Sequence, residues 1–140
     1  MGYMTDGLTF NTLRGGNERR LRDFKNSKGE VAHAKADGSD WSLGDWMTAV
    51  AGEVGEAANV LKKVRRGDLT LDEARPAIAR ELADVVIYLD LLAQQVDINL
   101  GRAVMDTFNR KSDQVGSRVR LAADDWHLTG AVEVIEAPKP

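Results

Sequence analysis

Residues 42–67 decide the fold, and they read SLGDWMTAVAGEVGEAANVLKKVRRG. Ser42 and Asp45 have the spacing of a helix N-cap followed by an acidic residue in the first turn, where the helix dipole favours negative charge. Gly67 suits the left-handed position that closes many helices. Between these signals, apolar residues recur at steps of three and four, which predicts one long helix with a single buried face. They are Leu43, Trp46, Met47, Val50, Val54, Ala57, Leu61 and Val64.

A second long helix is predicted before residue 97. Thr70 and Glu73 form a capping-box pattern for a short turn, after which Pro76 fits the first turn of the helix. One face carries Ile78, Leu82, Val85, Val86, Leu89, Ala93 and Val96, while Ile87, Leu91 and Leu92 lie elsewhere around it. A helix that is apolar on several sides is buried on several sides. In a chain of 140 residues we expect one of these sides to be a subunit interface.

The rest of the chain is assigned to the same domain. A third helix is expected from Ile98 to Asp113, and a short one from Asn17 to Phe24. Residues 117–140 lose the helical period and predict a surface-wrapping or frayed tail. The expected architecture is a single all-α domain over residues 1–140, with its helical core at about 41–116, an irregular N-terminal segment 1–40 and a C-terminal tail 117–140.

Composition excludes several classes of protein. The chain has no cysteine, so disulfides, thiolate metal sites and cysteine nucleophiles are ruled out. Its 19 basic and 22 acidic residues give a net charge of -3, the wrong balance for a general nucleic-acid binder. No apolar run approaches the ~20 residues of a membrane span, and the N-terminus does not resemble a secretory signal. We therefore expect a cytoplasmic protein with neither nucleic acid nor membrane as a partner.

Two pairs of carboxylates stand beside the apolar stripes. Glu53 and Glu56 are one turn apart on the first long helix, and Glu81 and Asp84 repeat that spacing on the second. If the helices pack antiparallel through a short turn, the four carboxylates can converge, and they then need compensating cations. Oxygen ligands favour Mg²⁺ or Mn²⁺, which suits phosphoryl or nucleotidyl cleavage. The alternative is two solvated helix faces, and spacing alone does not decide between these interpretations.

At these residues the sequence resembles the MazG-type all-alpha nucleoside triphosphate pyrophosphohydrolases, particularly their short phage and bacterial branch. The resemblance covers roughly residues 41–116. Its motifs are Trp41-Ser42 with Asp45-Trp46, then GEVGEAAN at 52–59, Lys62-Lys63 with Arg66-Gly67, ELADVVIYLD at 81–90, and FNRKS at 108–112. It implies a helical bundle completed by oligomerisation, as a homodimer or a dimer of dimers.

The resemblance also implies an activity and a set of residues. The enzyme would split a nucleoside triphosphate into monophosphate and pyrophosphate, and so control the nucleotide pool. The implied substrate is a deoxynucleotide, with a weak preference for dGTP. Glu53, Glu56, Glu81 and Asp84 would hold Mg²⁺, with Mn²⁺ as a substitute. Glu53 or Glu56 would also act in catalysis by orienting or deprotonating water. Asn109 and Lys111 would reach phosphate or sugar.

Other candidates come from their positions in the sequence. Lys63 shares the helix flank of Glu56 and is a candidate for substrate binding. Trp41 precedes the helix and is a candidate for stacking on a base, whereas Trp46 lies on the apolar stripe and is expected in the core. The N-terminal segment offers two interpretations. Its polar residues Asn17, Arg19 and Arg20 could reach a triphosphate, but a surface helix explains them equally well. Gly52 and Gly55 indicate the close approach of another helix or of a ligand, and we favour close helix packing. His33 and His127 are isolated, so neither is assigned to a metal or to catalysis.

Two rival functions stay open. One is a non-enzymatic oligomeric helical module with a regulatory or interaction role, in which the four acids are dispensable. The other is a related hydrolase that acts on a different phosphate compound.

Overall fold

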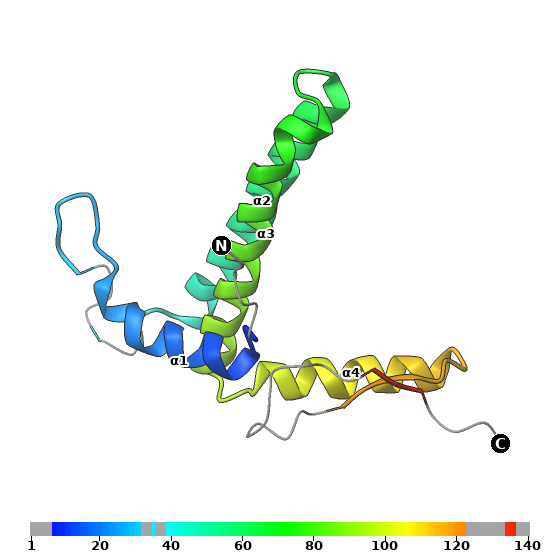
Figure 1. Cartoon of the computed structure of the whole chain (residues 1–140). Coiled ribbons are helices and arrows are strands. Elements are labelled where there is room, and N and C mark those ends of the chain that lie inside the picture. The colour runs from blue at the N-terminus through cyan, green and yellow to red at the C-terminus, as the bar shows by residue number, and fades with distance from the viewer. Residues whose placement is uncertain (1–6, 32–34, 36–38, 123–133, 137–140) are drawn as a thin grey trace. The chain divides into compact units, whose positions relative to one another are not determined.

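The structure is a computed structural model that describes residues 7–31, 35, 39–122 and 134–136. Most of the described chain is helical, which confirms the all-α prediction at that level. The elements are α1 (Phe10–Arg20), the 3-10 turn η1 (Leu21–Asp23), α2 (Leu43–Arg66), α3 (Leu71–Gln95), α4 (Leu100–Gln114), β1 (Val119–Leu121) and β2 (Val134–Glu136) (Figure 1). The chain divides into two compact units, one of residues 14–97 and the other of residues 1–13 with 98–140.

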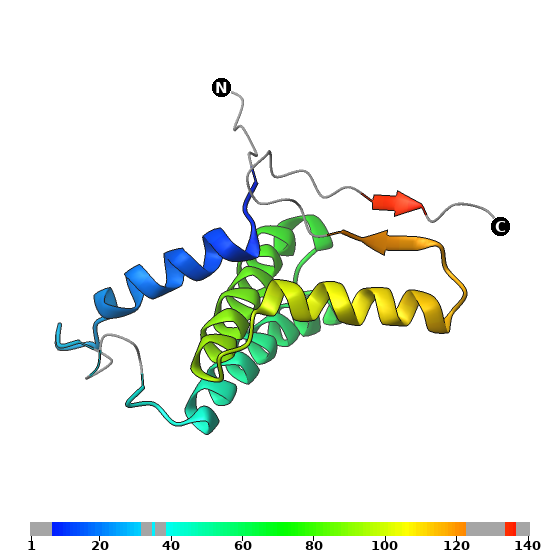
Figure 2. The same cartoon turned by 90° about the horizontal axis from the view of Figure 1, so that it is seen from below.

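Helices α2 and α3 form an antiparallel hairpin, as the two views of Figures 1 and 2 show. Helix α2 begins and ends where the sequence predicts. The Ser42 side chain accepts a hydrogen bond from the Asp45 backbone N–H, and the Asp45 carboxylate accepts one from the Ser42 backbone N–H. At the other end Gly67 has a φ of 79°, the left-handed conformation that glycine adopts without steric cost. Local signals therefore fix both ends of this helix.

Helix α3 begins earlier than predicted. Thr70 is its N-cap and forms a complete capping box with Glu73, so no separate turn precedes the helix. Pro76 consequently lies inside α3 rather than in its first turn. Because proline has no N–H, the carbonyl of Asp72 loses its usual helical donor. The helix nevertheless continues through the proline, and the capping box of Thr70 and Glu73 marks its start.

The core of this unit lies at the end of the hairpin away from Gly67. Leu21, Trp46 and Leu91 are fully buried there, and partly buried side chains pack around them: Phe24, Trp41, Ile87, Tyr88 and Leu92. Trp46 is 0% exposed, which confirms its predicted place in the core. The rings of Trp41 and Trp46 lie 4.8 Å apart between centroids and are tilted by 45°. The core thus uses α3 residues that the sequence placed outside the main stripe.

Much of the predicted apolar stripe is exposed in the single chain. Its exposed members are Leu43, Met47, Val54 and Leu61 on α2, and Leu82, Val86, Leu89 and Val96 on α3, with 36% to 54% of each residue accessible. A Cβ added at Gly52 or Gly55 would meet nothing within 4 Å, so the close packing expected there does not occur in this chain. A hairpin of two helices has too little partner surface to bury both faces of each helix. Of the helices described, none is both long and apolar enough to cross a membrane.

The N-terminal helix is also longer and earlier than predicted. Helix α1 spans Phe10–Arg20, so its last turn covers the start of the expected Asn17–Phe24 stretch, and η1 covers residues 21–23 of it. Thr9 precedes the helix, where its side chain accepts a hydrogen bond from the Thr12 N–H and its own N–H donates to the Thr12 hydroxyl. This reciprocal cap of two threonines starts the helix without an acidic residue in the first turn.

In the other unit, the short strand β1 packs against α4. The predicted helix Ile98–Asp113 is observed as Leu100–Gln114, with Asn99 as its N-cap. The Asn109 amide donates to the Leu121 carbonyl and accepts from the Leu121 N–H, both at 2.8 Å, so it pairs with β1 as a backbone would. Strand β1 pairs with β2 in antiparallel register. The expected irregular tail therefore contains a two-stranded sheet.

Candidate metal centre and adjoining pocket

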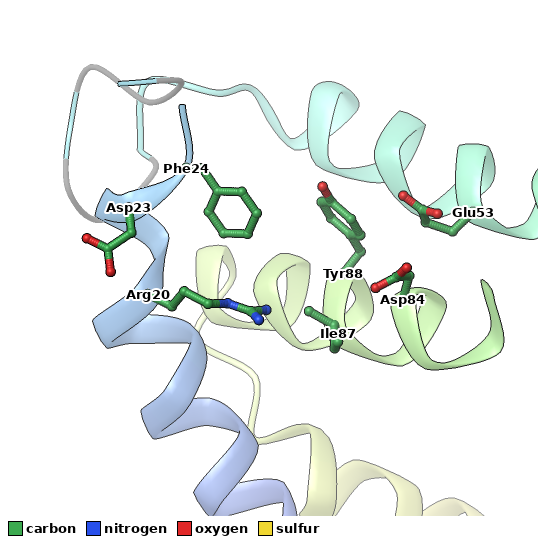
Figure 3. Close-up of a pocket in the computed structure, with 7 residues that line it drawn as sticks. All are labelled: Arg20, Asp23, Phe24, Glu53, Asp84, Ile87 and Tyr88. Atoms are coloured by element: carbon green, nitrogen blue, oxygen red, sulfur yellow. The ribbon is translucent and has the colours of Figure 1, made fainter. Parts of the chain in front are cut away.

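Three carboxylates converge between α2 and α3. Glu53, Glu81 and Asp84 each offer an oxygen within 4.8 Å of those of the other two. Glu81 and Asp84 are one turn apart and lie on the same side of α3, and the antiparallel hairpin brings Glu53 of α2 opposite them. In Figure 3 the carboxylates of Glu53 and Asp84 lie close together between the two helices. Glu81 is buried and the other two are half-buried, so the cluster has access to solvent from one side.

Glu56 lies outside this cluster. The structure brings together three of the four predicted metal ligands, and Glu56 is exposed on the next turn of α2. Its charge nevertheless acts on Glu53, whose pKa it helps to raise. One turn along α2 is enough to move a carboxylate from the side facing α3 to the rim.

The cluster holds more negative charge than its surroundings neutralise. Burial raises the pKa of Glu53, and the charges of Asp84, Glu56 and Glu81 raise it further. Arg80 pairs with one member of the cluster: its Nε lies 3.4 Å from Glu81 Oε1, while 67% of the Arg80 side chain stays exposed. Only the carboxylate of this pair is buried, and solvent screens the exposed guanidinium, so the pair offsets only part of the cluster's charge. Three oxygen ligands with uncompensated charge suit a hard divalent cation such as Mg²⁺ or Mn²⁺.

A pocket of about 370 Å³ adjoins the cluster. Its walls differ in chemistry: carboxylates on one side, aromatic and aliphatic groups behind, and a guanidinium from α1 (Figure 3). The lining residues are Arg20, Asp23, Phe24, Glu53, Asp84, Ile87 and Tyr88. The guanidinium carbon of Arg20 lies 5.5 Å from the centre of the Phe24 ring. This size falls within the range of small-ligand sites.

The pKa of Tyr88 is affected by the charged groups on both sides of the pocket. Burial raises the pKa of its hydroxyl, and the charges of Glu53 and Asp84 raise it further, whereas Arg20 acts in the opposite direction. The hydroxyl therefore stays protonated at neutral pH and is available as a hydrogen-bond donor.

The α1 wall of the pocket is held by a buried ion pair. Asp90 of α3 is 1% exposed and receives hydrogen bonds from Arg14 Nε at 3.1 and 3.2 Å. The Asn17 amide donates to the same carboxylate at 3.0 Å and to the Ile87 carbonyl at 3.3 Å. Arg14 and Asn17 thus fix residues 14–20 of α1 against α3, next to the wall that Arg20 supplies.

The other predicted site residues lie elsewhere. Trp41 packs on Trp46 and borders a separate hollow with Asp45, Thr48 and Ala49. Lys63 is exposed on α2 and does not line the pocket. Asn109, which pairs with the backbone of β1, and the exposed Lys111 belong to the other unit. Substrate binding by these four residues stays a prediction. His33 and His127 lie outside the described residues.

Sequence reasoning missed Phe24 and Ile87, and it did not recognise the ion pair of Asp90. One signal was available: Asp90 interrupts the most apolar part of α3, where an acid must be paired. Phe24 gave no comparable signal because it follows a helix in an irregular stretch.

No family model matches the chain, and neither does any curated protein or any solved structure. The functional inference therefore depends on the residues of the site, and membership of the MazG-type family stays a prediction.

Proposed function

We propose that the chain is a Mg²⁺-dependent nucleoside triphosphate pyrophosphohydrolase of the MazG type, which releases monophosphate and pyrophosphate. One observation carries the proposal: an under-neutralised cluster of three carboxylates opens into a pocket whose other walls are aromatic and cationic. Carboxylates suit a metal ion, aromatic rings suit a base, and a guanidinium suits phosphate. A nucleotide carries all three complementary features when a metal ion is bound to it.

The position of each carboxylate suggests its role in metal binding or proton transfer. Glu81 and Asp84 are the proposed metal ligands on α3, and Glu53 is the ligand on α2. Mg²⁺ bound there would neutralise the phosphates and lower the pKa of a coordinated water. Of the two catalytic candidates, Glu53 lines the pocket and Glu56 does not, which favours Glu53 as the acceptor of a proton from water. Glu56 would act from the rim, through its charge.

The proposal includes assembly of the chain with itself. Met47, Val54 and Leu61 follow one another at steps of seven on α2, and Leu82, Leu89 and Val96 do so on α3. This is the spacing of helices that pack side by side in bundles. A second copy presents the same faces and would bury them, as a homodimer or as a dimer of dimers.

A panel of ribo- and deoxyribonucleoside triphosphates, incubated with Mg²⁺ or Mn²⁺, tests the activity. We expect monophosphate and pyrophosphate from a deoxynucleotide, with dGTP as the first candidate, and loss of turnover with EDTA. Glu81→Gln should abolish turnover and weaken Mn²⁺ binding by at least tenfold, because it removes a buried ligand. Glu56→Gln, the matched control one turn outside the cluster, should weaken Mn²⁺ binding by clearly less.

Other results would support the rivals. Orthophosphate release would indicate a hydrolase with a different bond preference. If the unmodified chain shows neither turnover nor metal binding, and both variants fold as it does, the non-enzymatic helical module is the interpretation that remains.

A further inference from the structure

One cation, Arg20, and three anions, Asp23, Glu53 and Asp84, line the pocket. Arg20, Glu53 and Asp84 all line it, yet within the described part of the chain no ion pair joins Arg20 to either carboxylate. In Figure 3 the Arg20 side chain extends from α1 into the space beside Ile87, while the carboxylate of Asp23 points away from that space. The volume between Arg20 and the carboxylates is therefore bounded by positive charge on one side and negative charge on the other.

The Arg20 side chain is exposed, but the helix that carries it is fixed in place. The two turns of α1 before Arg20 carry Arg14 and Asn17, and both are bound to the buried carboxylate of Asp90. Phe24, one turn after Arg20, packs against the core and lies under the guanidinium. The backbone on both sides of Arg20 is thus anchored, so a ligand that binds the guanidinium does not also have to order the backbone.

We propose that Arg20 binds the phosphate end of a ligand whose metal-bound end lies at Glu53, Glu81 and Asp84, so that the pocket selects a metal-complexed polyphosphate. This inference rests on the proposed function and extends it. A bare cation would satisfy the carboxylates and leave Arg20 unused, and a bare anion would satisfy Arg20 and be repelled by the carboxylates. A polyphosphate with a bound metal ion presents positive charge to one wall and negative charge to the other. Arginine suits this role because its planar fork can donate two hydrogen bonds to one phosphate.

The experiment uses the full chain and inorganic tripolyphosphate, which has no base or sugar. Binding is measured by calorimetry in Mn²⁺, and Mn²⁺ binding alone is measured by electron paramagnetic resonance. Arg20→Gln should weaken tripolyphosphate binding about tenfold or more, the usual effect of losing charged hydrogen bonds, and leave Mn²⁺ affinity within about twofold. Arg20→Lys should restore part of the binding, since it keeps the charge and loses the fork.

Arg19→Gln is the matched control. Arg19 is the preceding residue of α1, is exposed, and does not line the pocket. It removes the same charge, so it should leave tripolyphosphate binding within about twofold. Equal losses in Arg19→Gln and Arg20→Gln would overturn the proposal and indicate general attraction. Loss of Mn²⁺ binding in Arg20→Gln would overturn it as well, because the residue would then act on the fold.

Failure of the metal site gives a different pattern. If the unmodified chain binds no Mn²⁺, the proposed function and the selection of a metal-complexed ligand are both wrong, and tripolyphosphate binding without metal then tests only the phosphate contact of Arg20. A selective loss in Arg20→Gln then still supports the phosphate site, and absence of any binding overturns it.

Discussion

At the scale of single residues, the surroundings of Glu53 explain most of the chemistry. It faces two carboxylates from α3 and has a third one turn away on its own helix. A folded chain without metal therefore keeps charges together that the unfolded chain separates. Metal binding and protonation are two ways to relieve the same repulsion, and each has a distinct dependence on pH.

The metal-free chain should lose stability as the pH rises through the titration of Glu53. The pKa of this carboxyl is raised above its ordinary value of 4.5, so the folded chain binds the proton more tightly than the unfolded chain. Stability from this group is complete below about pH 4.5 and is lost as the pH rises through the folded pKa. Urea denaturation from about pH 4 to about pH 7 measures the slope.

Glu53→Gln is the control for this pH dependence. It removes the titrating group, so part of the slope should disappear. Parallel curves for the two proteins would assign the dependence to other groups. Mn²⁺ affinity of the parent should rise with pH over the same window, since protons and metal compete for the carboxylates.

The sequence predicted this cluster only in part. The spacing of Glu81 and Asp84 placed them on one side of a helix, and the hairpin made Glu53 an expected neighbour. Helical spacing alone could not separate Glu53 from Glu56, because that depends on how α2 is rotated against α3. Trp46 and Leu91 set that rotation by packing into the same core.

At the scale of the elements, one buried ion pair determines where α1 lies. Asp90 is the attachment point on α3, and its bonds go to Arg14 and Asn17. Removing one member leaves a charge in a buried site, which costs far more than breaking an exposed pair.

Asp90→Asn should lower the free energy of unfolding by about 3 kcal/mol, because the Arg14 guanidinium loses its carboxylate while 24% of it stays exposed. Asp106→Asn is the matched control: Asp106 pairs with Arg102 at 3.0 Å on the surface of α4, and its loss should cost less than about 1 kcal/mol. Chemical denaturation of both variants gives the comparison. Equal and small effects would show that α1 is held by its apolar contacts instead.

Element boundaries were predictable where the signal was local. The caps at Ser42 and Gly67 set the ends of α2, and Thr70 set the start of α3. Helix α1 was misplaced because its cap is a pair of threonines and its attachment depends on Asp90, far away in the sequence. Strand β1 was missed because Asn109 supplies pairing groups that a strand normally takes from another strand.

At the scale of the whole molecule, the apolar faces of the hairpin predict self-assembly. We expect the chain to sediment as a dimer or larger at micromolar concentration. Val86→Glu places a charge within the exposed face of α3 and should shift the chain to monomer, since an unpaired charge is costly in an apolar interface. Sedimentation velocity measures both.

Thr107→Glu adds the same charge at an exposed position of α4 and should leave the assembly unchanged. A parent that sediments as a monomer would contradict the proposed bundle.

The two halves of the pocket differ in how far apart their residues are in the chain. Glu53 precedes Glu81 by 28 residues, whereas the pair of Arg14 and Asp90 joins residues 76 apart. Short loops close faster and at lower entropic cost than long ones. The acidic side should therefore assemble early in folding, while the last turns of α3 are being made, and the Arg20 side should follow when α1 docks. A newly synthesised chain would then meet Mg²⁺ before Arg20 lies beside the site, and the ion would favour the hairpin to which α1 later attaches.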